Sequence, residues 1–155
     1  MEYLLLKWLH VLSSTVLFGT GIGSAFYLLV ASLHRDPPVV AAVARYVVMA
    51  DWMFTATTVV LQPLTGGLMV HLAGLSLDAP WLAWSIGLYA LAVACWLPVV
   101  VLQMRMRDLA AAAATQRVPL PAGYWRAFRY WVALGIPAFF AFVAVFYLMV
   151  VKALP

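Results

Sequence analysis

The stretch WLAWSIGLYALAVACWLPVVVLQM, residues 81–104, decides the fold because it contains no charged side chain. A helix needs about 20 consecutive apolar residues to cross the hydrocarbon core of a bilayer. The chain has 155 residues, of which 67% are hydrophobic and only 9% are charged. Soluble domains contain about 25% charged residues. We therefore expect a polytopic membrane protein, surrounded by lipid and folded as a single domain over residues 1–155.

Four apolar runs predict an all-α bundle of four transmembrane helices. The expected helices cover residues 4–33, 47–72, 81–104 and 131–151. Residues 34–38 separate the first helix from the second, and Asp36 and the prolines that follow it suit a helix start. Residues 105–129 separate the third from the fourth, and their alanine-rich part can be helical before Pro119 and Pro121. We expect the first run to be a retained helix, because it is too long for a signal peptide and no small-residue cleavage site follows a short core.

The basic residues are unevenly distributed between the two ends of the expected bundle. Seven arginines lie in or beside the first and third connections, whereas only Lys7 and Lys152 lie toward the other side. The positive-inside rule then places both termini and the short turn at Asp78 outside. The formal charge of +4 does not indicate nucleic-acid binding, because no basic stripe alternates with aromatic residues on a soluble domain.

Two histidines are expected in the same leaflet of the membrane. His10 lies inside the first helix, about 9 Å from its expected outer start, and His71 lies at the outer end of the second helix. Ser14 and Gly21 share the helical face of His10, and Gly67 shares that of His71. Small residues beside a neutral imidazole leave room for a flat macrocycle, and imidazole nitrogen is an axial ligand of haem iron.

We therefore predict that His10 and His71 are metal ligands in a bis-histidine haem b, with Trp8 or Trp81 packed at the haem edge. Bis-histidine ligation leaves no open position on iron, so the expected function is one-electron transfer between a quinone and an outer acceptor. If only one histidine met the iron, oxidase or gas-sensing chemistry would follow. Each histidine taken alone is more often structural. Copper or zinc binding is less favoured, because no methionine or carboxylate cluster completes a coordination shell.

A polar stripe follows one face of the second helix. Its members are Asp51, Thr55, Thr58, Gln62 and Thr65. Carboxylates within a membrane are costly and usually functional. Asp51 and Gln62 are therefore candidate catalytic residues, which could begin a proton path or hold the polar group of a quinone or porphyrin. The alternative for Asp51, slightly favoured, is a structural ion pair with Arg45 or Arg105 at the inner interface.

The chain resembles a bacterial family of predicted integral membrane proteins of unknown function. The residues that carry the resemblance are Leu-Lys-Trp-Leu-His ending at His10, the pair Phe18-Gly19, ADWMFT at 50–55 and QPLTG at 62–66. More remotely, the Lys-x-x-His start and the aromatic-Gly pair are similar to those of HemJ-type protoporphyrinogen oxidases and copper-resistance D-type membrane proteins. That similarity implies a haem-binding bundle in the bacterial inner membrane, with His10 at the position of the families' first-helix histidine. The HemJ-type proteins also use a membrane lysine, which the second and third spans lack here.

Two other functions remain open. One is haem-dependent porphyrinogen oxidation, in which Gln62 and Asp51 would bind or deprotonate the substrate. The other is a non-catalytic transport or assembly subunit, whose histidines would bind copper or no metal at all. Gly19 and Gly23 form a GxxxG pattern, which lets another helix approach closely, so a homodimer or a larger membrane complex is an expected assembly.

Overall fold

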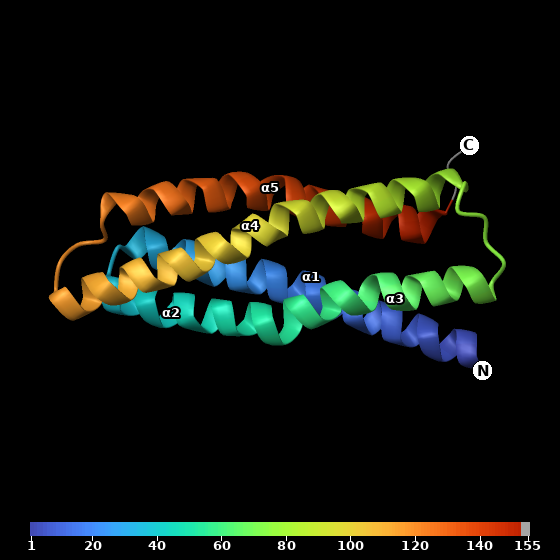
Figure 1. Ribbon diagram of the computed structural model, residues 1–155, viewed down its shortest axis with the longest axis horizontal. Coiled ribbons are helices and arrows are strands. Elements are labelled where there is room, and N and C mark those ends of the chain that lie inside the picture. The colour runs from blue at the N-terminus through green and yellow to red at the C-terminus, as the bar shows by residue number, and fades with distance from the viewer. Residues whose placement is uncertain (153–155) are drawn as a thin grey trace.

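The protein is a bundle of four long helical rods. The computed structural model describes residues 1–152. Its elements are α1 Glu2–His34, α2 Pro37–Ala50, the π-turn η1 Asp51–Thr55, α3 Ala56–Leu72, α4 Pro80–Gln116 and α5 Ala122–Val151 (Figure 1). The elements α2, η1 and α3 follow one another without a break, so they form one rod. All four rods are long and apolar enough to cross a membrane, which confirms the expected fold class.

The helices run alternately up and down. Both ends of the described chain and the α3–α4 turn lie at one end of the bundle, here called the terminal end (Figure 1). The α1–α2 turn with Arg35 and the α4–α5 loop with Arg117 lie at the opposite, arginine-rich end. Which end faces the cytoplasm remains a prediction from the distribution of basic residues.

The helices are longer at the arginine-rich end than the sequence suggested. The second rod begins at Pro37, after Asp36, where the sequence suggested a helix start, and not at residue 47, where the expected membrane span begins. The helix α4 continues through the alanine-rich segment to Gln116, and α5 begins at Ala122 instead of 131. The long expected connection of 105–129 shrinks to residues 117–121. The reason is that these helix ends are amphipathic: their polar residues are exposed, while their small apolar residues are buried in the core.

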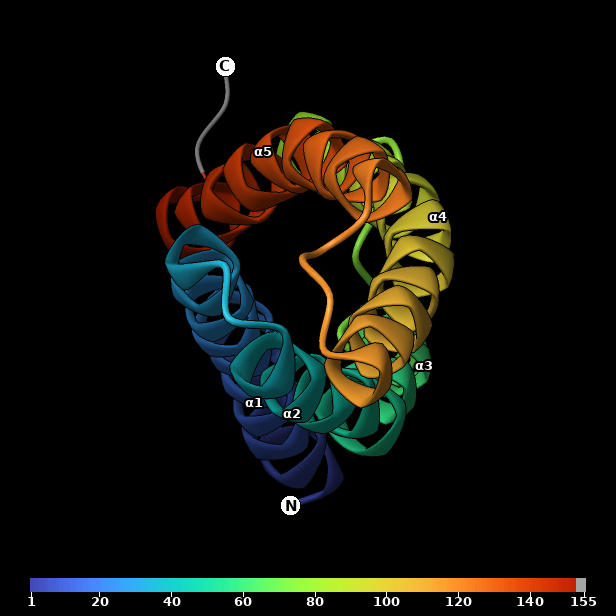
Figure 2. The same ribbon diagram turned by 90° about the vertical axis from the view of Figure 1, so that its left-hand side faces the viewer.

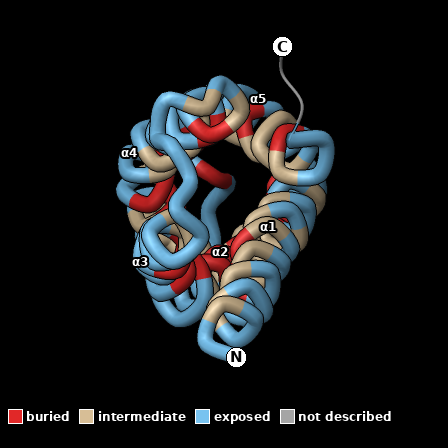
Figure 3. The backbone as a smooth tube through the Cα atoms, turned by 90° about the vertical axis from the view of Figure 1, so that its right-hand side faces the viewer, coloured by how far each residue is buried: buried red, intermediate tan, exposed pale blue. Residues whose placement is uncertain are grey.

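The tightest packing lies in the arginine-rich half. Leu28, Val40, Met106 and Tyr124 are completely buried in one hydrophobic cluster. The Tyr124 hydroxyl also lies 2.6 Å from Ser32 Oγ and so joins α5 to α1. Viewed along the bundle, the rods surround a central axis (Figure 2), and the buried residues face it (Figure 3). Lipid-facing surfaces keep large apolar side chains exposed, as a bilayer environment requires.

The second rod stays helical through Pro63, which lies inside α3. A proline has no N–H, so the carbonyl of Val59, four residues earlier, loses its usual helical donor. The hydroxyl of Tyr89 on α4 donates to that carbonyl at 2.6 Å instead. The departure from regular α-helical geometry lies earlier, in η1, and π-turns of this kind are frequent at functional sites.

Candidate functional site

The imidazole of His10 lies half-buried at the contact between α1 and α3. Its Nδ1 is 2.8 Å from Thr65 Oγ1, and the Thr65 hydroxyl donates its one hydrogen to the Leu61 carbonyl at 2.7 Å. With its hydrogen on the Leu61 carbonyl, Thr65 would accept a hydrogen bond from the Nδ1–H of His10, which is one of the two possible tautomers of the ring. In this tautomer Nε2 keeps its lone pair, and no hydrogen bond within residues 1–152 involves that nitrogen.

Gln62 on α3 forms hydrogen bonds with α1 close to His10. Its Nε2 donates to the His10 carbonyl at 2.9 Å and to Ser13 Oγ at 2.6 Å. The side chain is buried, so these bonds are shielded from competing water. The polar stripe predicted on the second rod thus faces His10 on α1, and Gln62 holds the backbone that carries the imidazole.

A glycine makes room for the imidazole, but it is not the glycine expected from the sequence. A Cβ atom on Gly66 would lie 3.3 Å from His10 Cε1, which is tighter than an ordinary contact. A Cβ on Gly67 or on Gly21 would meet nothing within 4 Å. Neighbouring residues on a helix differ by about 100° in direction, so Gly67 points away from His10. Sequence reasoning missed Gly66 because it placed His71 on the face toward His10.

His71 lies apart from His10 in this structure. It is exposed in the last turn of α3, about 9 Å beyond Thr65 along the helix axis. It also lies more than about 100° around the helix from both Thr65 and Gly66. The two histidines therefore do not share one face or one gap between helices.

The other expected haem contacts also lie away from His10. Ser14 donates to the Val11 carbonyl of its own helix at 2.8 Å, and the Trp8 side chain is exposed. The Trp81 ring lies 5.8 Å from Lys152 Nζ in a cation–π contact at the terminal end.

A separate cavity of about 160 Å³ lies inside the bundle beside η1. Three of its lining side chains carry a buried polar atom without a hydrogen-bond partner: Asp51 Oδ2, Trp96 Nε1 and Gln103 Oε1. Asp51 and Gln103 are each only 4% exposed. The other carboxyl oxygen of Asp51 accepts a hydrogen bond from Thr55 Oγ1 at 2.9 Å, within the π-turn. Gly21 also lines the cavity.

The expected ion pair of Asp51 with Arg45 or Arg105 is wrong. Arg45 and Arg105 are exposed, and the guanidinium of Arg45 contacts the Tyr46 hydroxyl at 3.3 Å. Within residues 1–152 the salt bridge is that of Arg107 with Asp108. The reason is that Arg45 and Arg105 lie on the exposed faces of their helices, whereas the Asp51 carboxyl faces the interior of the bundle.

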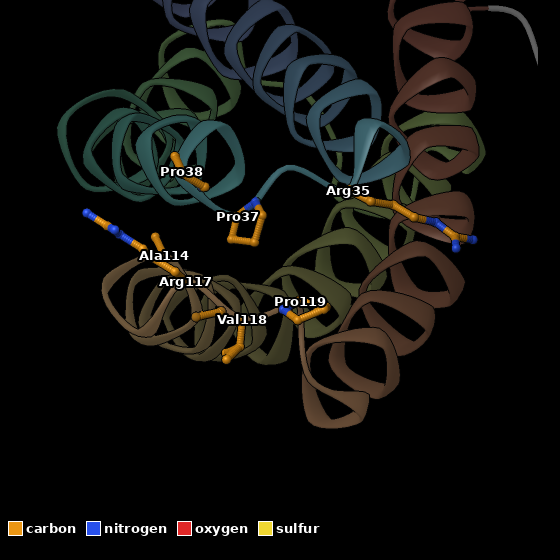
Figure 4. Close-up of a pocket in the computed structure, with 8 residues that line it drawn as sticks. Arg35, Pro37, Pro38, Ala114, Arg117, Val118 and Pro119 are labelled. Atoms are coloured by element: carbon orange, nitrogen blue, oxygen red, sulfur yellow. The ribbon is translucent and has the colours of Figure 1, made fainter.

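A second hollow, of about 410 Å³, lies at the arginine-rich end, between the α1–α2 turn and the end of α4. Arg35 and Arg117 are among its lining residues, but their guanidinium groups extend away from each other (Figure 4). The guanidinium of Arg35 lies over the Trp125 ring, 5.3 Å from its centroid. The charges therefore do not converge on a ligand position. Within residues 1–152, no group of three or more histidine, cysteine or acidic side chains could hold a metal ion.

Comparisons with known proteins place the chain in a family without assigning an activity. No curated protein and no solved structure matches it. A family model described as "Predicted integral membrane protein (DUF2269)" matches residues 4–153. Because this match spans nearly the entire sequence, the chain belongs to the DUF2269 family of integral membrane proteins.

Proposed function

We propose that this protein is a membrane-embedded b-type haem protein for one-electron transfer, with His10 as an axial ligand of the iron. The observation that carries the proposal is the 2.8 Å contact between His10 Nδ1 and Thr65 Oγ1, which supports the tautomer in which Nδ1–H donates and Nε2 keeps its lone pair. Metal-binding histidines almost always donate their second ring nitrogen in this way, which fixes the ring orientation. A bound haem would supply the one-electron chemistry.

The surroundings of His10 support a ligand role for this residue in particular. Ser13 and Leu17, on the same inward face of α1, are buried. Gln62 fixes the backbone of His10, and the missing side chain at Gly66 lets the imidazole lie against α3. These contacts restrict both the position and the rotation of the ring, which lowers the entropy cost of binding iron.

A haem would have to lie beside His10 toward the terminal end, and not in the cavity at η1. That cavity of about 160 Å³ is smaller than the pockets of about 300–1,000 Å³ that hold drug-sized ligands, and His10 does not line it. A porphyrinogen is also too large for this cavity, so the cavity gives no support to porphyrinogen oxidation at Asp51. Because His71 faces elsewhere, His10 is the ligand that this arrangement favours, and a second ligand from His71 would need a rotation of the α3 end.

The test is an absorption spectrum of the detergent-purified protein from cells supplied with haem, first oxidised and then reduced with dithionite. We expect a Soret band and sharpened visible bands on reduction. His10→Ala should lose the haem, whereas His34→Ala, an exposed histidine at the arginine-rich end, should retain it. A change from low-spin to high-spin bands in His71→Ala would show bis-histidine ligation, and an unchanged spectrum would show ligation by His10 without His71.

Thr65→Val tests the orienting hydrogen bond separately from the ligand. The variant keeps His10 but removes the acceptor of its Nδ1–H, so haem affinity should fall by about 10- to 100-fold. Haem-free wild-type protein, or full haem content in a folded His10→Ala variant, would refute the proposal. Metal analysis and a search for a co-purifying partner would then test the copper, transport and assembly alternatives.

A further inference from the structure

We propose that the cavity beside η1 binds a single aromatic ring that carries hydroxyl or carbonyl groups, which is the chemistry of a quinol or a simple phenol. The site lies between α1, the second rod, α4 and α5. The proposal does not rest on haem binding, because neither His10 nor His71 lines this cavity.

The polar atoms of the cavity call for a ligand that both donates and accepts hydrogen bonds. Trp96 Nε1 can only donate, Gln103 Oε1 can only accept, and Asp51 Oδ2 accepts when ionised and can donate when protonated. Buried polar atoms are nearly always partnered in native proteins. The Gln103 side chain also lies within hydrogen-bonding reach of the Asp51 carboxyl, so Trp96 Nε1 is the group that most needs an outside partner. A hydroxyl or carbonyl oxygen of a quinol or quinone would accept from Trp96 Nε1 and would also lie beside the Asp51 and Gln103 oxygens.

The apolar lining residues and the volume of the cavity fit a flat, apolar ring. Val59, Trp131 and Phe142 line the cavity with aliphatic and aromatic groups. An apolar protein cavity of about 150 Å³ accepts one benzene ring, and this cavity measures about 160 Å³. One substituted ring fits this space, whereas the four pyrrole rings of a porphyrin do not.

Two side chains that line the cavity also reach the lipid-facing surface of the bundle. Ile22 on α1 and Phe139 on α5 line the cavity and are also 41% and 40% exposed on the lipid-facing surface. Phe18 on α1 stacks on Phe139 with 5.9 Å between ring centroids, so the seam between the two helices consists of apolar side chains. The tail of a membrane quinol could remain in this seam while its ring reaches Asp51.

The backbone at the polar end of the cavity is also specialised. The π-turn η1 begins with Asp51 and ends with Thr55, and both side chains are buried. A π-turn places one extra residue in a helical turn and so changes the direction of the side chains that it carries. The non-regular turn therefore coincides with the carboxyl group that lines the cavity.

The experiment measures binding to the full-length purified protein by calorimetric titration and by quenching of tryptophan fluorescence. The probes are hydroquinone and a benzoquinol with a short alkyl tail. Gly21→Leu should fill the cavity and abolish binding of both probes, since a Cβ at Gly21 meets nothing within 4 Å. Gly19→Leu makes the same change on the exposed side of α1 and should leave binding unchanged.

Two substitutions test the hydrogen bonds. Trp96→Phe keeps a six-membered aromatic ring but removes the pyrrole part of the indole with its N–H, so binding should weaken by about tenfold. Trp84→Phe is the matched control, because Trp84 is on the same helix and exposed. Asp51→Asn should weaken binding by a similar factor, while Asp78→Asn, an exposed carboxylate, should not. Helical circular dichroism of each variant shows that the bundle is intact.

The two probes distinguish the sources of the ring. Much tighter binding of the alkylated benzoquinol would identify a membrane quinol, and equal binding of both would identify a small phenol. Absence of binding by either probe to the wild-type protein would overturn the proposal and leave water as the partner of the three polar atoms. Equal binding to wild type, Gly21→Leu and Trp96→Phe would overturn it too, because the probe would then bind elsewhere.

Discussion

The hydrogen bond from Tyr89 to the Val59 carbonyl should contribute more to the free energy of unfolding than an ordinary hydrogen bond, because Pro63 removes the alternative donor. The bond is 2.6 Å long and partly buried. Tyr89→Phe leaves the carbonyl without its helical donor and without water in an apolar setting. An unsatisfied buried polar group costs about 1–3 kcal/mol, and we expect the free energy of unfolding to fall by that amount.

A second substitution isolates the cause. In Pro63→Ala the restored N–H can bond to the Val59 carbonyl, so adding Tyr89→Phe should then cost less than about 1 kcal/mol. The four proteins form a double-mutant cycle with a coupling energy of about 1–2 kcal/mol. Unfolding by SDS in mixed micelles, followed by circular dichroism, measures each value. Tyr147→Phe, at an exposed tyrosine, is the control. Equal costs of Tyr89→Phe with and without Pro63 would refute the reasoning.

Two further predictions concern the helix contacts on either side of the bundle. Gly66→Ala should displace the His10 imidazole and destabilise the α1–α3 contact by about 1 kcal/mol, because the new Cβ would lie 3.3 Å from His10 Cε1. Gly67→Ala is the control, since its Cβ would meet no atom within 4 Å. Thermal unfolding of both variants in the same detergent compares them, and equal melting temperatures would contradict the predicted contact. Tyr124→Phe removes the 2.6 Å hydrogen bond to Ser32 in the core. It should lower the free energy of unfolding by about 1 kcal/mol. An unchanged midpoint of unfolding by SDS would show that this bond does not stabilise the fold.

The sequence alone determined the fold class and the number of membrane-spanning helices. Those properties depend on local composition, because an uncharged run such as residues 81–104 must be a helix if it lies in lipid. The sequence also indicated His10 and the polar stripe of Asp51 and Gln62, since polar side chains stand out in an apolar helix. It indicated the helix start after Asp36 and a helix before Pro119, but it placed the start of α5 too late, because charged residues there occupy the exposed face of a continuing helix.

Only the tertiary structure decided which faces meet. It joined His10 to Thr65 and Gly66, and left His71 exposed on a different face. It also placed Trp96 and Gln103 of α4 around the same cavity as Asp51, without the arginine partner expected for that carboxyl. The physical reason is that helical periodicity fixes the residues on a face but not the rotation of one helix against another. That rotation depends on packing between residues far apart in the chain, which periodicity does not reveal.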